Sequence, residues 1–270
     1  MNSQTRALQR MAGKVAVVTG GTQGLGEAIS RRLLAEGAVG VAFCGRNVEN
    51  GQRLERELNA QGRAMFVRAD LEQVDECHAF VDAAVERFGQ VDVVVNCGAS
   101  TKRGTVTDTT PAVWDQLFDT NVRGPFFVIQ RAVLDMQKRK AGGSIAIVGS
   151  MQAHGGAPFL LPYAATKGCL MTLTKGMANA LLWDRIRVNM INIGWTDTPN
   201  EHVVQMQVHG RPANWLAEVS KGQPFGRLIQ VDEAANAVLF MVSDESGMMS
   251  GAVIDFDQQV IGTMRDNPGV

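Results

Sequence analysis

The chain has 270 residues, of which 45% are hydrophobic and 20% are charged, and its formal net charge is −1. These values are ordinary for a globular protein with a sizeable core, and the length fits one large α/β domain. The near-neutral charge and the lack of a dense Lys/Arg block give no reason to expect a nucleic-acid partner. No segment approaches the roughly 20 apolar residues that span a bilayer, so no membrane association is expected.

The cysteine and histidine patterns argue against a disulfide-bonded protein and against a metal-binding protein. Cys44, Cys77, Cys97 and Cys169 are scattered and form no CxxC pair, which favours reduced thiols. The first eleven residues also lack the apolar stretch of a secretory signal, so we expect a cytoplasmic protein. The histidines at 202 and 209 have no carboxylate at ligand spacing, and no metal site is expected.

Short apolar runs alternate with helical patterns along the chain. Strands are predicted at 14–19, 39–44, 64–69, 92–96, 144–149, 187–193 and 253–256. Helices are predicted at 24–36, 48–59, 73–88, 111–139, 163–182 and 231–243. The strands are apolar throughout, which is typical of a parallel sheet that is covered on both faces. The order predicts a doubly wound, Rossmann-type parallel sheet of about seven strands, flanked by helices.

No repeat, low-complexity linker or shift in composition divides the chain, so a single domain is expected. Residues 1–12 are interpreted as an N-terminal extension and residues 13–270 as the domain. The least regular part of the pattern precedes the last helix, and we expect it to form a lid over the substrate around residues 197–228.

A glycine-rich turn, Thr19-Gly20-Gly21-Thr22-Gln23-Gly24-Leu25-Gly26, separates the first predicted strand from the first helix. Glycines let the backbone approach a ligand closely, and the free N–H groups and dipole of a helix start favour an anion. Glycines also end strands for purely structural reasons. The position between the first strand and the first helix nevertheless favours a site for a dinucleotide pyrophosphate.

Tyr163 and Lys167 form the second informative pattern. Residues four apart share one face of a helix, and an ammonium group beside a phenol lowers the pKa of that phenol. Ser150 follows an apolar strand thirteen residues before Tyr163, where its hydroxyl could hold a substrate oxygen. A Tyr-x-x-x-Lys motif by itself is usually a surface pair. Tyr163, however, is the only tyrosine in the chain.

Taken together, these motifs resemble the short-chain dehydrogenase/reductase family, from Gly13 to about Gly262. The resemblance implies an oxidoreductase that transfers a hydride between a nicotinamide cofactor and a secondary alcohol or carbonyl. It assigns four catalytic roles. Tyr163 is the acid/base, Lys167 lowers its pKa and holds the cofactor ribose, Ser150 orients the substrate oxygen, and Asn121 supports a proton-relay water.

The resemblance also assigns cofactor contacts. Arg46 follows the second strand without a carboxylate beside it, which favours NADP(H) over NAD(H). Gln23 argues the other way, because NADP-preferring relatives often place a second basic residue there. Cys97 and Ile193 depart from the family's Asn-Asn-Ala-Gly and Pro-Gly segments. The assigned positions are Gly20, Thr22, Gln23, Gly24, Leu25, Gly26, Arg46, Asp70, Leu71, Asn96, Gly98, Tyr163, Lys167, Ile193 and Thr198.

The sequence indicates the identity of the substrate less clearly than it indicates the cofactor and the catalytic residues. Gln152, His154 and Trp195 are expected to line it together with Ser150 and Tyr163, and this lining suits a sugar or polyol. A 3-oxoacyl thioester or small ketone stays open. Other classes of function are a catalytically silent nucleotide-binding regulator and an epimerase or dehydratase, although four filled catalytic positions favour the oxidoreductase. The resemblance further implies a homotetramer.

Overall fold

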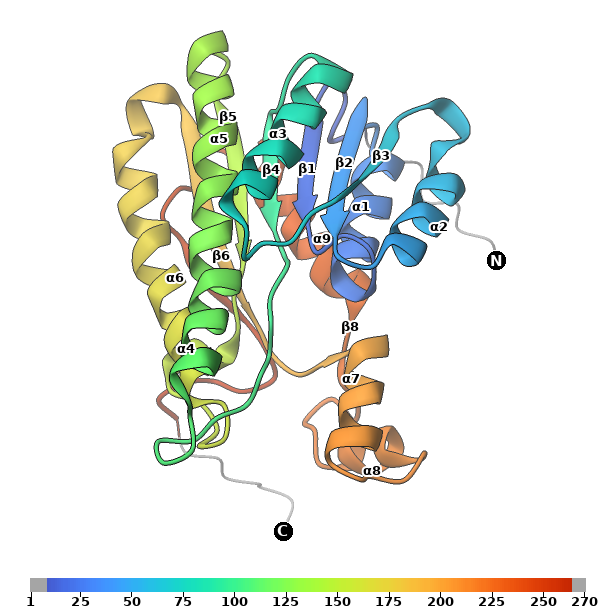
Figure 1. Cartoon of the computed structure of the whole chain (residues 1–270), viewed down its shortest axis with the longest axis vertical. Coiled ribbons are helices and arrows are strands. Elements are labelled where there is room, and N and C mark those ends of the chain that lie inside the picture. The colour runs from blue at the N-terminus through green and yellow to red at the C-terminus, as the bar shows by residue number, and fades with distance from the viewer. Residues whose placement is uncertain (1–8, 264–270) are drawn as a thin grey trace.

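Seven parallel strands form the centre of the protein, in the order β3-β2-β1-β4-β5-β6-β9. The computed structural model describes residues 9–263 (Figure 1). The order reverses direction between β1 and β4, and in such sheets ligands bind outside the carboxyl ends of the strands at this point. The strands are β1 (Val15–Thr19), β2 (Gly40–Gly45), β3 (Ala64–Arg68), β4 (Val93–Asn96), β5 (Gly143–Val148), β6 (Ile186–Ile193) and β9 (Val253–Phe256).

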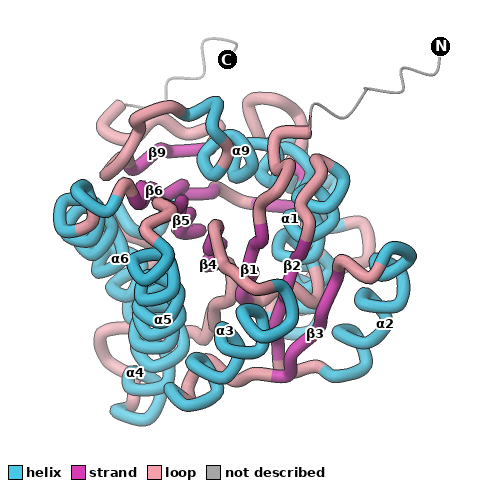
Figure 2. Tube along the Cα trace, turned by 90° about the horizontal axis from the view of Figure 1, so that it is seen from above, coloured by secondary structure: helices cyan, strands magenta, loops and turns pink. Residues whose placement is uncertain are grey.

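Helices cover both faces of the sheet (Figure 2). On β1, Ala16 and Val18 join the core cluster under α1 and α9, whereas Val17 joins the cluster under α3, α5 and α6. Every residue of β1 is buried, which confirms the prediction of a sheet covered on both sides. The helices are α1 (Gly24–Ala35), α2 (Val48–Leu58), α3 (Val74–Phe88), α4 (Pro111–Phe118), α5 (Gly124–Arg139), α6 (Leu161–Ala180), α7 (Pro199–Val203), α8 (Trp215–Lys221) and α9 (Val231–Val242).

The chain is helical throughout the predicted range 111–139, but the middle of this range is not α-helical. A five-residue π-helical turn, Asp119–Arg123, separates α4 from α5. Pro125 has no N–H, so it cannot complete the helical bond to the carbonyl of Asn121. Gly124 packs against the segment that follows β3, where an added Cβ would come 2.0 Å from the carbonyl oxygen of Leu71. The wider turn that results carries Asn121.

A second, two-stranded parallel sheet, β7 (Thr196–Asp197) with β8 (Ile229–Gln230), marks where the chain leaves the main body and returns. Between these strands lie α7, a π-helical turn (Val204–Val208) and α8. We call residues 197–228 the lid segment; in Figure 1 it is the orange part beyond the carboxyl ends of the main strands.

Residues ahead of Gly13 also pack against the domain. Met11 is fully buried in the core cluster under α1, and its N–H donates to the carbonyl of Glu36 at 2.9 Å. The guanidinium of Arg10 lies 2.9 Å from the Glu36 carboxylate. The rest of the predicted N-terminal extension, residues 1–8, lies outside the described residues. Between residues 9 and 263, no helix has the length and apolar character needed to cross a bilayer.

Candidate active site

Tyr163 and Lys167 lie on the buried face of α6, near its first turn. Only 8% of Tyr163 and 3% of Lys167 is exposed. The Lys167 Nζ lies 5.6 Å from the centre of the Tyr163 ring and donates a hydrogen bond to the carbonyl of Val148, at the end of β5, at 3.0 Å. The helical spacing therefore brings the phenol and the ammonium together, away from bulk water.

Burial shifts the pKa values of both groups away from their ordinary values. The pKa of Tyr163 rises to about 12 because the phenolate would be poorly solvated, although a hydrogen bond with the Ser150 side chain opposes this rise. Burial lowers the pKa of Lys167 to about 8 because the ammonium loses its hydration. Burial therefore favours the protonated phenol, and additional positive charge nearby would lower the pKa of Tyr163.

Ser150 lies two residues after the end of β5 and caps a short 3-10 helix, Met151–His154. Its Oγ accepts a hydrogen bond from the N–H of Gln152 at 3.2 Å. The same hydroxyl bonds the Tyr163 side chain. Ser150 therefore lies at the carboxyl end of the sheet within reach of the phenol, as the resemblance implies.

Asn121 connects the π-helical turn to two other segments. Its Oδ1 accepts from the N–H of Ser100 at 2.7 Å, and its Nδ2 donates to the Ser100 carbonyl at 2.9 Å and to the Thr166 Oγ1 at 3.1 Å. Thr166 in turn donates to the carbonyl of Tyr163 at 2.6 Å. Both amide hydrogens of Asn121 are thus used. For the predicted relay water, its side chain retains only a free lone pair on Oδ1.

The glycine-rich turn is packed so tightly that only glycine fits. Gly20 has a φ of +64°, and an added Cβ would lie 2.5 Å from the Cα of Gly98. At Gly26 an added Cβ would lie 2.2 Å from the carbonyl oxygen of Gly20. Gln23 precedes α1 but its side chain makes no capping bond, so the first N–H groups of α1 remain available to an anion. This cradle fits the pyrophosphate of a dinucleotide.

Thr19 fastens this turn to the end of β4. Its Oγ1 donates to the Asn96 Oδ1 at 2.8 Å and accepts from the N–H groups of Cys97 and Gly98 at 3.1 and 3.0 Å. The close approach of Gly20 to Gly98 depends on this arrangement, which joins the ends of the two central strands.

The remaining predicted cofactor positions lie at the same edge of the sheet. Asp70 and Leu71 follow β3, and Ile193 ends β6. Thr198 begins α7, where its Oγ1 accepts from the N–H of Glu201 at 3.1 Å. A Cβ on Gly24 would lie 3.7 Å from the Cβ of Thr198, so the turn and the lid segment approach each other here. Thr22 and Leu25 lie in the turn and in the first turn of α1.

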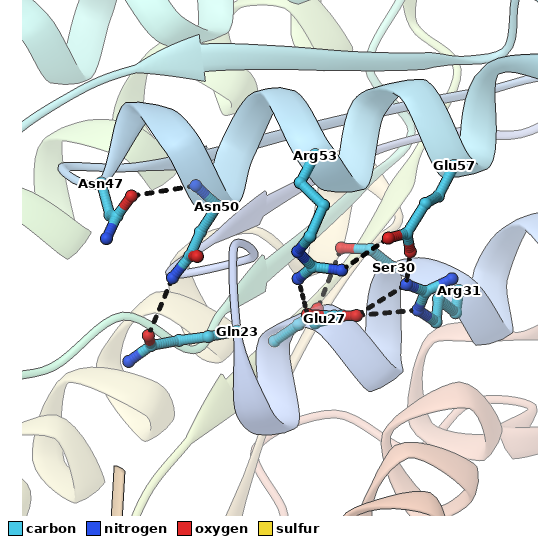
Figure 3. Close-up of polar contacts among 9 residues, drawn as sticks. Gln23, Glu27, Ser30, Arg31, Asn47, Asn50, Arg53 and Glu57 are labelled. Carbon is cyan, nitrogen blue, oxygen red and sulfur yellow. Dashed lines mark hydrogen bonds and ion pairs between the residues drawn. The ribbon is translucent and has the colours of Figure 1, made fainter. Parts of the chain in front are cut away.

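Arg46 is exposed beside two carboxylates. Its Nη1 lies 3.7 Å from the Glu72 Oε1 and 4.0 Å from the Asp70 Oδ2, and 59% of the side chain is accessible. On the other side of the turn, the Gln23 Oε1 accepts from the Asn50 Nδ2 at 3.4 Å (Figure 3). The charge of Arg46 is therefore shared with nearby acids but remains open to a ligand.

Comparisons with known proteins agree with this geometry. A family model described as enoyl-(acyl carrier protein) reductase matches residues 20–258. The 3-alpha-(or 20-beta)-hydroxysteroid dehydrogenase of Mycobacterium tuberculosis is 33% identical over 96% of this chain and 93% of its own length. The L-fucose dehydrogenase of Mus musculus is 33% identical over 88% of this chain and 85% of its own.

The chain belongs to the short-chain dehydrogenase/reductase family. It is an oxidoreductase of that family. Among solved structures, L-sorbose reductase from Gluconobacter frateurii, complexed with NADPH and L-sorbose, matches with a TM-score of 0.87 and 26% identity. That match covers 94% of this chain and 98% of the reductase.

The three side chains predicted to line the substrate bind to other parts of the protein. The Gln152 Oε1 accepts from the N–H of Ala157 at 2.7 Å, within the loop that precedes α6. The His154 ring lies 2.8 Å from the Asp255 Oδ1 on β9. The Trp195 Nε1 donates to the Glu201 Oε1 at 2.7 Å. Their contact with substrate stays a prediction.

Sequence reasoning missed the residues that hold this short-chain dehydrogenase/reductase site together. Thr166 could have been found, because it lies three residues after Tyr163 and so on a neighbouring position of the helix surface. Ser100 and Arg103 gave no such signal. They follow β4 in a loop whose partners, Asn121 and His209, are distant in the chain.

Proposed function

We propose that the protein interconverts a secondary alcohol and its carbonyl compound with NADP(H), and that the alcohol is a sugar or polyol. The observation that carries this proposal is the buried Tyr163–Lys167 pair, with Ser150 bonded to the phenol at the sheet edge where the glycine-rich turn ends. A bound nicotinamide supplies or accepts the hydride. The protein's task is to hold the substrate and move one proton.

The proton passes through the phenol of Tyr163. In oxidation the phenolate takes the hydroxyl proton of the substrate, and in reduction the phenol returns it. Because burial holds the pKa of Tyr163 at about 12, nearby positive charge has to lower it. The Lys167 ammonium supplies such charge when protonated, and the oxidised nicotinamide would add to it. Lys167 would also bind the ribose hydroxyls.

Ser150 is suited to hold the reacting oxygen. Its hydroxyl already bonds the Tyr163 side chain, so a substrate oxygen placed between them would meet both groups. A hydroxyl donor aimed at that oxygen stabilises negative charge as it develops there. Asn121 would act through Ser100 and Thr166, fixing the backbone on either side of the site and offering one lone pair to a water.

NADP(H) is favoured by the end of β2. The strand ends at Gly45 and is followed by Arg46 and Asn47, so no carboxylate stands at the end of this strand, where NAD-binding proteins use one to hold the ribose. The exposed guanidinium of Arg46 is suited to bind that phosphate. L-sorbose reductase, a structural relative, is complexed with NADPH.

The sugar or polyol assignment is supported by two relatives whose names state sugar substrates, L-fucose dehydrogenase and L-sorbose reductase. A 3-oxoacyl thioester is the second candidate, because a solved structure that is 32% identical to this chain is described as a betaketoacyl-ACP reductase. Assembly as a cytoplasmic homotetramer stays a prediction from the family resemblance.

The test compares wild type with Tyr163→Phe in nicotinamide absorbance assays, using NADP⁺ and NAD⁺ with sugars, polyols and simple secondary alcohols. We expect the variant to lose about 100-fold or more in turnover, because the proton-transfer group is gone, while cofactor binding is retained. Cofactor binding without turnover by wild type in either direction would instead indicate a silent regulator.

A further inference from the structure

A short loop after β4, residues 100–105, lies against the start of the catalytic helix; we call it the rim segment. Its first residue, Ser100, is held through both backbone groups by the Asn121 side chain. Further on, the N–H of Gly104 donates to the Phe159 carbonyl at 3.0 Å, and the Gly104 carbonyl accepts from the N–H of Leu161 at 3.2 Å. Because α6 begins at Leu161, these bonds place Arg103 close to the turn that carries the catalytic tyrosine.

The lid segment reaches across to this arginine. The Arg103 Nη2 donates to the His209 Nε2 at 2.7 Å, so the imidazole is neutral at that nitrogen. The guanidinium carbon lies 5.6 Å from the centre of the Phe159 ring, and the His209 ring lies 6.1 Å from the same ring, edge to face. Three segments that are distant in the chain therefore meet at Arg103: the rim segment, the loop before α6 and the lid segment.

Arg103 has no counter-charge. Within residues 9–263 no carboxylate oxygen lies within ion-pair distance of it, and its side chain makes one hydrogen bond, to a neutral ring. Its Nε–H is enclosed and has no acceptor among the described residues. Some half-buried arginines pair with carboxylates, as Arg139 does with Asp135 and Asp92, and others donate to backbone carbonyls, as Arg63 and Arg187 do; Arg103 has neither kind of acceptor among the described residues. A guanidinium with five donors and one partner is a binding group that awaits an acceptor.

A second unpaired guanidinium lies on the lid segment. Arg211 follows His209 by two residues and lies 6.0 Å above the centre of the Trp195 ring. No described carboxylate is in ion-pair distance of Arg211 either; the nearby Glu201 bonds the Trp195 and Gln205 side chains instead. The rim segment and the lid segment thus each carry a guanidinium that has no carboxylate partner among the described residues.

We propose that Arg103 binds a carboxylate carried by the substrate, with Arg211 contributing charge from the lid segment. The substrate is accordingly a sugar or polyol that also carries an acid group, such as a sugar acid. A planar carboxylate matches the guanidinium fork, and charge-assisted hydrogen bonds of this kind are the strong ones. This inference rests on the proposed function, because it assigns the acid group to the substrate whose hydroxyl meets Tyr163.

The test uses matched substrate pairs in which a carboxylate replaces one hydroxymethyl group, gluconate with sorbitol and glucuronate with glucose, for wild type, Arg103→Gln and Arg103→Lys. We expect wild type to prefer the acid of each pair. Arg103→Gln should raise the KM for acids about 10- to 100-fold, the worth of a charge-assisted contact, and leave the KM for neutral partners nearly unchanged. Arg103→Lys should fall between the two. If Arg103→Gln instead raised the KM for acids and for neutral partners by the same factor, Arg103 would only hold the lid segment in place.

A binding measurement separates this inference from the proposed function. Tryptophan fluorescence of cofactor-loaded wild type, Arg103→Gln and Arg211→Gln is followed while each acid or neutral partner is titrated. If acids bind more tightly than their neutral partners in wild type only, the carboxylate site stands even where no turnover is seen. If acids bind no better than neutral partners, the inference is wrong whatever the enzyme oxidises. Circular dichroism of the variants verifies that they are folded.

Discussion

The glycine-rich turn and the lid segment lie at the same edge of the sheet but are held in place by different parts of the chain. In the turn, backbone touches backbone, and a single added carbon at Gly20 or Gly26 has no room. In the lid segment, side chains make the contacts. Trp215 donates to His202 at 3.2 Å, and His202 bonds Asp197 at 2.8 Å. The backbone packing of the turn leaves no room for substitution at these glycines, whereas the side chains of the lid segment can be exchanged singly.

Gly26→Ala is expected to have the largest effect, and it tests whether the glycine-rich turn tolerates an added carbon. The new Cβ would lie 2.2 Å from the carbonyl oxygen of Gly20, so the turn has to move. We expect a loss of about 1–3 kcal/mol in the free energy of unfolding and a matching weakening of cofactor binding. Isothermal titration with both cofactors and denaturant unfolding measure the two effects.

Gly176→Ala is the matched control. Gly176 lies in the exposed middle of α6, where an added Cβ meets nothing within 4 Å. Alanine is the better helix former there, so stability should rise by up to about 1 kcal/mol while cofactor affinity stays unchanged. If Gly26→Ala behaved like this control, the backbone packing of the turn would not exclude an added carbon.

Lys167→Met tests how much the buried charge of Lys167 reduces the free energy of unfolding. Burial lowers the pKa of Lys167 to about 8 in the folded protein, against about 10.4 for a free lysine in the unfolded chain. Between these values the unfolded chain holds more protons, so wild-type stability rises with pH from about 8 to about 10.4. At neutral pH the charged lysine costs the fold about 3 kcal/mol. The variant should be inactive yet more stable at pH 7.

The stability advantage of Lys167→Met should shrink as pH rises through that window, as urea unfolding at several pH values would measure. Losing the bond from Nζ to the Val148 carbonyl offsets part of the gain but does not change with pH. Lys175→Met, at an exposed lysine on the same helix, controls for the loss of a lysine as such. A stability difference that stayed constant with pH would contradict the assigned burial.

The contrast between the turn and the lid segment also explains which features could be predicted from the sequence. The seven main strands and the turn follow from local patterns, apolar runs and glycine spacing, and Tyr163 and Lys167 need only one helix to meet. The π-helical turn at 119–123 was readable in principle, because Gly124-Pro125 disturbs the α-helical pattern. The bond between Arg103 and His209 was not, since these residues are 106 positions apart and meet only when the lid segment folds back.

A smaller effect is expected from Arg46→Gln, which tests whether this exposed side chain contributes to the affinity for the cofactor. Asp70 and Glu72 already share the charge of Arg46, so its contact with a 2′-phosphate should be worth only about 10-fold in affinity. NADP⁺ binding should weaken by that factor and NAD⁺ binding should hardly change. Arg53→Gln is the control, because Arg53 on α2 is paired with Glu27 on α1 and with Glu57 on its own helix (Figure 3). Equal weakening of both cofactors would remove the argument for NADP(H).

The smallest global effect is expected within the lid segment, from Trp215→Phe. Trp215 is 1% exposed and stacks near Trp195, and the substitution removes its bond to His202 along with part of its ring. One lost hydrogen bond is worth about 1 kcal/mol, and because few backbone contacts hold this segment, the cost should fall on local opening. Hydrogen exchange should therefore speed up in residues 199–221 while β1 and β4 remain protected. Trp183→Phe, at a 98% exposed tryptophan, should change neither region. Faster exchange in the central strands of Trp215→Phe would mean that the lid segment and the cofactor end unfold together, and the two regions would then be one cooperative unit.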